Sequence, residues 1–204
     1  SSTGNCTPAA RLSHVKNARE AGLASPPIAD VSNTMTRSRL SREKWIAAGF
    51  KALAASGPTA LAAEPLARAL GTTKGSFYWH FKDVPAFQEA MLTTWHAQAL
   101  EDVLTQVGQS GEPDTRLRAF GQTILASPVE PKLGIWAASD TRVAIALAEV
   151  DAERLQYLTR LLGRMGLGNP DFARALQATL IGLPFGTDAD GSAFETLVDT
   201  VLAL

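Results

Sequence analysis

The chain has 204 residues, of which 46% are hydrophobic and 19% are charged, so it is long enough to bury a sizeable core in one or two domains. Its single cysteine, Cys6, excludes a disulfide framework and a cysteine-based metal site within one chain. Apolar runs fall far short of the roughly 18 residues that a membrane span needs. The N-terminus lacks the pattern of a signal peptide. We therefore expect a cytoplasmic protein with no membrane partner, no metal and no cofactor.

Charge divides the chain into two unequal parts. Residues 35–82 contain eight Lys/Arg and two acidic residues, a net charge of +6, whereas residues 83–204 contain eight Lys/Arg and sixteen acidic residues, a net charge of −8. A small basic segment joined to a larger acidic one indicates that the first part meets a polyanion and the second does not.

Residues 1–34 are rich in Ser, Pro, Asn, Gly and Ala and lack a sustained apolar period, which predicts a disordered extension. The sequence begins with Ser, and Met35 stands directly before the basic segment. A start at Met35, with residues 1–34 outside the native protein, is therefore an open alternative. The predicted organisation is an extension over 1–34, a basic module over 35–82 and a larger helical domain over 83–204.

Apolar residues recur at helical spacing from Ser38 onward and predict an all-α fold. The first helix, over 39–55, ends at Ser56-Gly57-Pro58, a Gly followed by Pro. A second covers 63–70 and stops at Gly71; Thr72-Thr73 then offers a hydroxyl cap for a third over 74–80. Asp83 caps a long fourth helix that runs to about Gly108. Further helices are expected over 113–126, 132–138, 141–165, 170–183 and 192–203.

The second and third predicted helices, joined by a turn that contains Gly71, form a helix-turn-helix. In that motif the second helix lies in the DNA major groove. Phe77 and Phe81, four residues apart, would face the first two helices and leave the outer side to Thr73, Lys74, Ser76, Tyr78 and Trp79. Gly75 would let the backbone approach DNA closely.

The segment "LARALGTTKGSFYWHFKD", near the N-terminus of an all-helical chain of this length, resembles the TetR family of bacterial transcriptional repressors. Gly71, Gly75, Tyr78, His80 and Phe81 fall in register with the family pattern. Thr72, Ala63 and Val84-Pro85 depart from it.

The resemblance implies that Tyr78, His80 and Lys82 hold phosphates, that Thr73 caps the third helix, and that the exposed face of this helix reads bases. For His80, a satisfied core histidine is the alternative. The predicted DNA-binding residues are Arg37, Arg39, Arg42, Thr72, Thr73, Lys74, Gly75, Ser76, Tyr78, Trp79, His80 and Lys82.

One recognition helix reads few base pairs, so such proteins bind palindromic DNA as two-fold dimers. By the resemblance, the last two helices pair with their copies in a four-helix bundle. The alternative is that these apolar faces close the core of the monomer. The predicted interface residues are Phe172, Leu176, Leu180, Leu183, Phe194, Leu197, Val198 and Val201.

In the family, the larger domain is a sensor in which a small molecule enters between the fourth and seventh helices and shifts the fourth. The candidate walls here are Trp95, Phe120, Trp136 and Tyr157, and the candidate polar selectors are His96, Asp140 and Arg142. For His96, plain helix packing is the alternative. The identity of the effector is not readable from the sequence.

Catalysis finds little support, because common catalytic and nucleotide-binding motifs are absent from the sequence. We therefore predict a protein that is not an enzyme but a ligand-responsive repressor, which binds a palindromic operator in double-stranded DNA as a homodimer. The alternative is an all-helical dimeric module that binds an acidic protein and has no specific DNA site.

Overall fold

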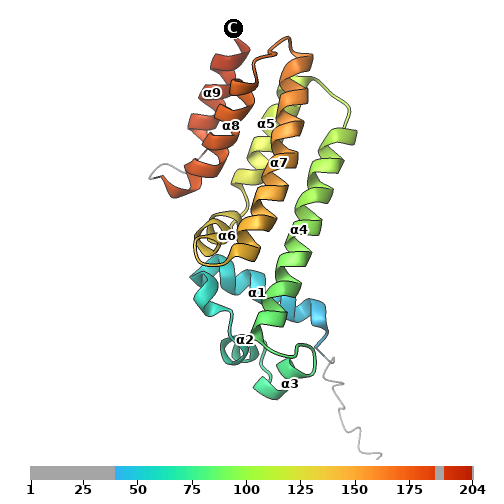
Figure 1. Ribbon diagram of the computed structural model, residues 1–204, viewed down its shortest axis with the longest axis vertical. Coiled ribbons are helices and arrows are strands. Elements are labelled where there is room, and N and C mark those ends of the chain that lie inside the picture. Colours follow the sequence, from blue (N-terminus) through green and yellow to red (C-terminus); the bar gives the residue numbers. More distant parts are fainter. Residues whose placement is uncertain (1–39, 187–190, 204) are drawn as a thin grey trace, which may run out of the picture. The chain divides into compact units, whose positions relative to one another are not determined.

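In a computed structural model, the structure describes residues 40–186 and 191–203, and these form α-helices and two short 3-10 helices without any strand (Figure 1). The all-α prediction is confirmed for this part of the chain. The predicted extension over 1–34, and Arg37 and Arg39, lie outside the described residues. The helices are α1 Arg42–Ser56, η1 Pro58–Ala60, α2 Ala63–Ala69, α3 Lys74–Tyr78, α4 Val84–Gly108, α5 Pro113–Leu125, α6 Glu130–Ala137, α7 Thr141–Arg164, α8 Pro170–Gly182, η2 Leu183–Phe185 and α9 Ser192–Leu202.

Side-chain caps fix several helix starts. The Ser41 hydroxyl accepts a hydrogen bond from the Lys44 N–H at 3.4 Å, so α1 begins at Arg42, three residues later than the pattern predicts. Asp83 Oδ1 accepts from the Ala86 N–H at 2.7 Å, which confirms Asp83 as the cap of α4. The start of the longest helix, directly after the helix-turn-helix, is therefore fixed.

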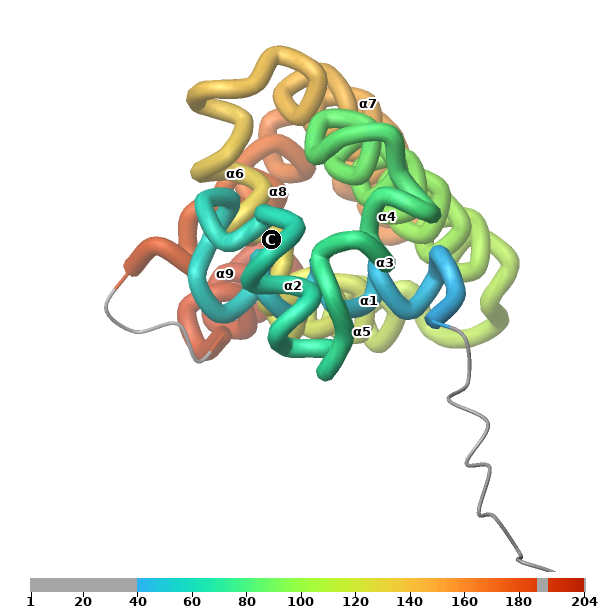
Figure 2. Tube along the Cα trace, turned by 90° about the horizontal axis from the view of Figure 1, so that it is seen from below, coloured from blue at the N-terminus to red at the C-terminus, as the bar shows by residue number. Residues whose placement is uncertain are grey.

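The long helices α4 and α7 pack along each other, and α6 and α8 also pack on α7 (Figure 1). Seen from below, α1, α2 and α3 gather around the start of α4 (Figure 2). Helix α4 thus leads from the helix-turn-helix into the larger helical part. None of the described helices is long and apolar enough to cross a membrane.

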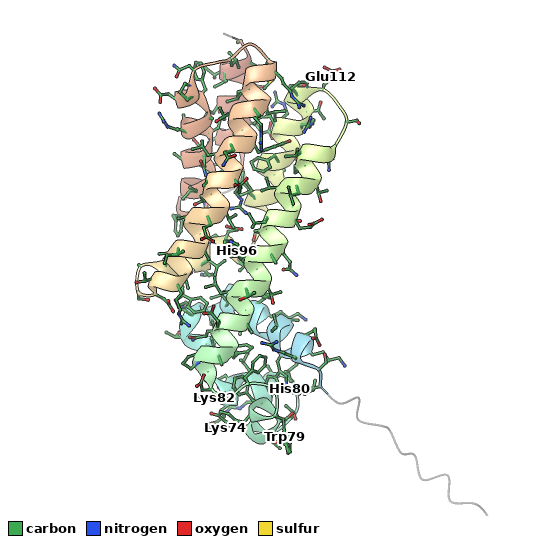
Figure 3. The ribbon with its side chains drawn as sticks, turned by 45° about the vertical axis from the view of Figure 1, so that its right-hand side comes forward. Lys74, Trp79, His80, Lys82, His96 and Glu112 are labelled. Atoms are coloured by element: carbon green, nitrogen blue, oxygen red, sulfur yellow. The ribbon has the colours of Figure 1, made fainter. Side chains whose placement is uncertain are left out.

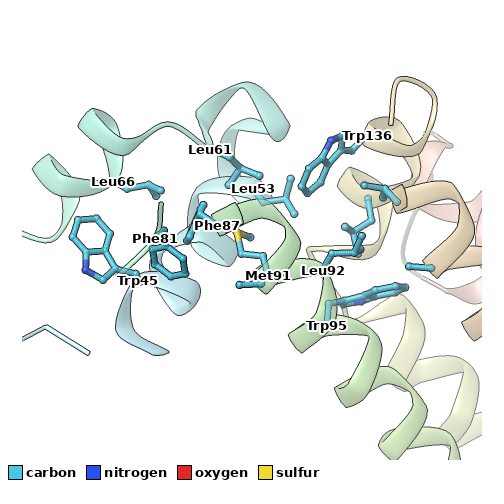
Figure 4. Close-up of a cluster of buried hydrophobic side chains, with 14 of the residues drawn as sticks. Trp45, Leu53, Leu61, Leu66, Phe81, Phe87, Met91, Leu92, Trp95 and Trp136 are labelled. Carbon is cyan, nitrogen blue, oxygen red and sulfur yellow. The ribbon is translucent and has the colours of Figure 1, made fainter. Parts of the chain in front are cut away.

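The interior contains two apolar clusters. The first joins Trp45 and Phe77 of the basic segment to Phe87, Met91 and the indole of Trp136 (Figure 4). The second lies among α4, α5, α7, α8 and α9. The first cluster contains residues from both sides of residue 83. The basic segment and the larger part therefore share one continuous apolar cluster.

Gly49 sets how closely α1 approaches α4. A Cβ atom at this position would lie 2.6 Å from Phe87 Cζ and would also collide with the thioether of Met91. Real Cβ atoms essentially never come that close. Only glycine permits this packing, which ties the basic segment to the first turns of α4.

Candidate nucleic-acid interface

The turn between α2 and α3 depends on Gly71. Its φ of 63° lies in the left-handed region, which favours glycine. The following N–H, of Thr72, donates to the Ala67 carbonyl at 2.9 Å and closes the end of α2. The chain therefore turns sharply enough to start α3 at Lys74, as the motif requires.

Thr73 occupies the N-cap position of α3, but its side chain makes no capping hydrogen bond. The prediction that its hydroxyl caps α3 is therefore wrong, and the exposed Thr73 side chain is open to solvent. Helix α3 is also shorter than predicted, ending at Tyr78 rather than residue 80. The His80 N–H still donates to the Phe77 carbonyl at 3.0 Å, so the chain continues in a tight turn.

Phe77 anchors the short α3 helix. Its side chain is fully buried, and its ring centroid lies 5.3 Å from those of Trp45, Phe81 and Phe87. Two of these contacts are edge-to-face, the favourable arrangement for aromatic pairs. The predicted inward orientation of Phe77 and Phe81 is confirmed, and the five-residue helix is held by rings from α1 and α4.

The opposite face of α3 presents rings and cations to solvent. Trp79 is 89% exposed and Tyr78 is 47% exposed, values that a core role does not explain. Lys74 Nζ lies 6.0 Å from the centre of the Tyr78 ring, within the range of a cation–π contact. Figure 3 shows Lys74, Trp79 and Lys82 together at the end of the molecule that α3 forms.

Cations around this face have few carboxylate partners. No ion pair within 4 Å is found for Lys74, Lys82 or Arg42 among the described residues, and the Arg42 guanidinium lies 5.3 Å from the centre of the Phe81 ring. Thr72, Ser76 and His80 are half-buried at the edge of the same face. The face is therefore positively charged and open to a polyanion.

Gly75 has no packing reason within the chain to be a glycine. A Cβ atom there would meet only Thr73 Oγ1, at the ordinary contact distance of 3.7 Å. Its φ also needs no glycine, because it lies outside the left-handed region. The missing side chain leaves room on the outer face, where a partner's backbone could approach.

Residues 46–83 match the model of the family described as bacterial regulatory proteins, tetR family. The match runs from within α1 through α2 and the turn to the end of α3 and on to Asp83. Over residues 46–83 the chain is thus similar to this family. The matched segment contains the helix-turn-helix, α2 to α3.

Several solved structures have a similar fold. A putative TetR-family transcriptional regulator from Rhodococcus sp. is 18% identical, with a TM-score of 0.63, over 79% of this chain and 98% of that one. A transcriptional regulator from Rhodococcus sp. Rha1 is 21% identical, with a TM-score of 0.63, over 80% and 95%. Reduced NemR from E. coli is 21% identical, with a TM-score of 0.61, over 79% and 93%. A comparison with curated proteins finds no match.

A pocket of about 210 Å³ opens in the larger helical part of the chain. It lies where the two apolar clusters meet, because Trp95 and Ala99 of the first cluster and Val103 and Phe120 of the second line it. Of the predicted effector residues, Trp95 and Phe120 line this pocket, whereas Tyr157 lines a separate, smaller one.

The other predicted effector residues lie elsewhere. Trp136 is buried in the first cluster. Asp140 caps α7 and forms an ion pair with Arg142, which also pairs with Glu89. The Arg142 side chain, by hydrogen bonding, lowers the pKa of Asp140 below its ordinary value. None of these three residues lines the 210 Å³ pocket.

His96 does not line the pocket either, although it lies midway along α4 (Figure 3). Its Nε2 is 2.9 Å from Glu149 Oε2 of α7, but the angles do not meet those of a hydrogen bond, so Nε2 has no partner of good geometry. This contact corresponds to the helix-packing alternative.

Three residues that line this pocket, Phe50, Glu130 and Arg154, were not predicted from the sequence. Phe50 reaches the pocket from α1, and the Glu130 carboxylate accepts two hydrogen bonds from the Arg154 guanidinium, at 2.8 and 3.2 Å. The Trp95 indole N–H also donates to Glu130, at 3.3 Å. No local signal links Glu130 to Arg154. By contrast, Gln98, Asp102 and Gln106 lie four apart on one face of α4, and this spacing could have revealed them.

The predicted dimer interface requires a correction. Leu176, Leu180, Phe194, Val198 and Val201 are all buried in the core of the monomer, at most 3% exposed, so they cannot form an outer face. Phe172, Leu183 and Leu197 are half-buried against the same core. A Cβ atom at Gly121 of α5 would collide with the Phe194 ring, which shows how closely α9 packs on α5.

The outer side of α8 and α9 is different in character. Beside the ion pair of Arg174 with Asp171 it presents mainly small side chains, and Ile181, at 49% exposure, is the largest exposed apolar one on α8. The exposed residues of this side are Ala175, Ala178, Ile181 and Gly182 on α8 and Ala193, Thr196 and Thr200 on α9. The apolar stripes seen in the sequence thus serve the monomer core, as the alternative interpretation held.

Proposed function

We propose that the chain is a TetR-family regulator, a ligand-responsive repressor that binds a palindromic operator as a homodimer. The observation that carries the proposal is the outer face of α3, where Trp79 and Tyr78 are exposed beside Lys74, while Phe77 anchors the helix in the core. A helix that is anchored in the core and has a solvent-exposed, cationic outer face suits insertion into the major groove.

We assign different roles to the parts of the chain before and after the boundary at residue 83. Residues 35–82 would bind DNA, and residues 83–204 would dimerise and sense the effector. Tyr78, His80 and Lys82 would hold phosphates, with Lys74 and Ser76 at base edges. Phosphate contacts set affinity and position, whereas base contacts set sequence preference.

We place the dimer interface on the small-residue outer side of α8 and α9 rather than on their apolar stripes. Small side chains such as Ala178 and Thr200 let helix backbones approach closely. A two-fold dimer would use the same face of both subunits, and it would set the spacing of the two α3 helices.

The 210 Å³ pocket is the proposed effector site, because it contacts both α1 and α4. Phe50 lines it from α1, and five α4 residues besides Trp95 line it along the helix. Gly49, beside Phe50, packs directly on Phe87 and Met91 of α4. An occupant that displaces Phe50 or α4 would therefore move the helix-turn-helix. A ligand acts this way only if it binds the two arrangements with different affinities.

The pocket's charge favours a neutral or cationic effector. Its one basic residue, Arg154, is already bound to Glu130, whereas the Asp102 carboxylate forms no ion pair within the described residues. The Gln106 side-chain oxygen is buried without a hydrogen-bond partner. Both groups would accept hydrogen bonds from an amine or hydroxyl donor.

A titration with DNA fragments from the chromosomal neighbourhood of the gene tests the proposal. We expect one palindromic fragment to bind at nanomolar protein concentration, and a neutral or cationic small molecule to release it. Gly75→Ala is the matched variant, since the chain has room for the methyl group. It should keep the melting temperature and weaken operator binding. Equal, weak binding to all fragments would favour the protein-interaction alternative.

A further inference from the structure

Two arginines are the only charged side chains that are buried among the described residues, and their surroundings differ. Arg154 is 8% exposed and has two carboxylate partners, Glu130 at 2.8 Å and Asp151 at 3.6 Å. Arg116 is 7% exposed and has no carboxylate within 4 Å in the described part of the chain. Its Nη2 donates to the Gln106 carbonyl at 2.7 Å and to the Tyr157 hydroxyl at 3.4 Å, and its Nε is buried without a partner.

A buried cation without an anion is strongly unfavourable, because desolvation is not offset by a counter-charge. The position of Arg116 adds to this cost. It is the fourth residue of α5, near the helix N-terminus, where the helix dipole disfavours positive charge. A structural role alone does not explain why this guanidinium lacks a carboxylate.

Arg116 lines a pocket of about 90 Å³, which we call the arginine pocket; its other lining residues are Val107, Tyr157, Arg160, Leu161 and Arg164. The lining contains three arginines and no acidic residue. Arg160 and Arg164 form no ion pair in the described part of the chain, and they lie one turn apart, where like charges repel.

The C-terminal dipole of α7 favours arginines in its last turns. That effect explains Arg160 and Arg164 but not Arg116, which comes from another helix. Convergence of guanidinium groups from α5 and α7 on one small pocket is the arrangement that binds an oxyanion, because each planar fork can donate two parallel hydrogen bonds.

We propose that the arginine pocket binds a dianionic oxyanion group, namely a phosphate. Three cations with no acid favour a dianion over a monoanionic carboxylate. The volume of about 90 Å³ is far below the roughly 300–1,000 Å³ of drug-sized ligand sites. It therefore suits one phosphate group, either free or at the end of an organic molecule. The site is separate from the effector pocket, but Gln106 connects them, lining one pocket with its side chain and binding Arg116 with its carbonyl.

Calorimetric titration of the full chain with inorganic phosphate at constant ionic strength tests the proposal. We expect saturable binding of one phosphate per chain, with acetate binding far more weakly. Arg160→Ala and Arg164→Ala remove exposed side chains and should each weaken phosphate binding on the order of tenfold or more. Arg174→Ala, which removes an exposed arginine paired with Asp171 on α8, is the control and should leave the affinity unchanged.

Glu112 provides a second control, because it precedes Arg116 by one helical turn at the start of α5 (Figure 3). If a rotated Glu112 were the natural counter-ion, only Glu112→Gln would bind phosphate, and the proposal would be overturned. No saturable binding, or equal loss in Arg174→Ala, would also overturn it. Tighter binding of glycerol phosphate than of inorganic phosphate would assign the group to an organic ligand, and the reverse to free phosphate.

Discussion

The basic segment and the larger helical part differ in how many of their cations are ion-paired. In the helix-turn-helix, Lys74 and Lys82 are exposed and have no carboxylate partner among the described residues. In the larger part, Arg118, Arg142 and Arg154 each bind two carboxylates. The two lysines thus remain available to a polyanion, whereas these three arginines join helices of the larger part.

The two regions also differ in how they are anchored. The helix-turn-helix depends on one ring, Phe77, with aromatic neighbours from α1, α3 and α4. The larger part distributes its apolar contacts over five helices. A short recognition helix needs a concentrated anchor because five residues cannot form a stable helix by themselves.

The largest expected effect comes from removing that anchor. Phe77→Ala should lower the free energy of unfolding by about 3–5 kcal/mol, because a fully buried ring leaves a cavity. Urea denaturation measures it. Trp79→Ala, at an 89% exposed ring, is the control and should change stability by no more than about 0.5 kcal/mol. Similar losses in both variants would contradict the anchor assignment.

The next largest effect distinguishes the core side of α8 from the side that we propose as the dimer interface. Leu180→Ala should destabilise the monomer fold by about 2–5 kcal/mol, because Leu180 is 2% exposed. The neighbouring Ile181→Arg lies on the outer side and should instead shift sedimentation toward monomers while the helix content remains. If Ile181→Arg stays dimeric and folded, the proposed interface is wrong.

A smaller effect is expected where the two regions meet. Gly49→Val should cost about 1–3 kcal/mol, since the added side chain would displace Phe87 and Met91. Gly163→Val, at an exposed α7 glycine with nothing within 4 Å, is the control for helix propensity alone. Equal changes in the denaturation midpoints of the two variants would show that α1 and α4 are not tightly coupled.

The smallest effect concerns the ion pair between Arg142 and Asp140 in the larger part. Arg142 lowers the pKa of Asp140 in the folded state. The ionised Asp140 therefore stabilises the fold at pH values above the pKa that Asp140 has in the unfolded chain, and this contribution is lost as pH falls through its folded-state pKa. Asp140→Asn keeps a capping side chain, so its deficit should be under about 1 kcal/mol at neutral pH. The deficit should begin to shrink as pH falls below about 4, the ordinary pKa of Asp, and should vanish only below the lowered pKa of the folded state. Thermal unfolding across pH measures it, and a constant deficit would contradict the assignment.

Local signals predicted the helices well. Gly57-Pro58, Gly71 and Asp83 end or start helices by backbone geometry and capping, which depend on neighbouring residues alone. The inward and outward sides of α3 were also predictable, because Phe77 and Phe81 share one face.

Packing between distant helices was not predictable. On α8, Leu180 and Ile181 are adjacent and both apolar, and only the positions of α5, α7 and α9 decide that Leu180 faces inward. Similarly, Leu104 is 64% exposed although it follows the apolar period of α4. Glu130 and Arg154 meet only because α6 packs on α7.

The most direct test of the account is operator binding by Lys74→Ala and Tyr78→Phe, measured on the operator and on its single-base variants at two salt concentrations. Tyr78→Phe should weaken binding by about 1 kcal/mol on all sequences, because one phosphate hydrogen bond is lost. Lys74→Ala should reduce discrimination at one position per half-site by about 1–3 kcal/mol if it contacts a base. A phosphate contact would instead lower the salt slope by about one ion per subunit. If neither variant changes affinity, α3 does not face DNA, and the proposed function is contradicted.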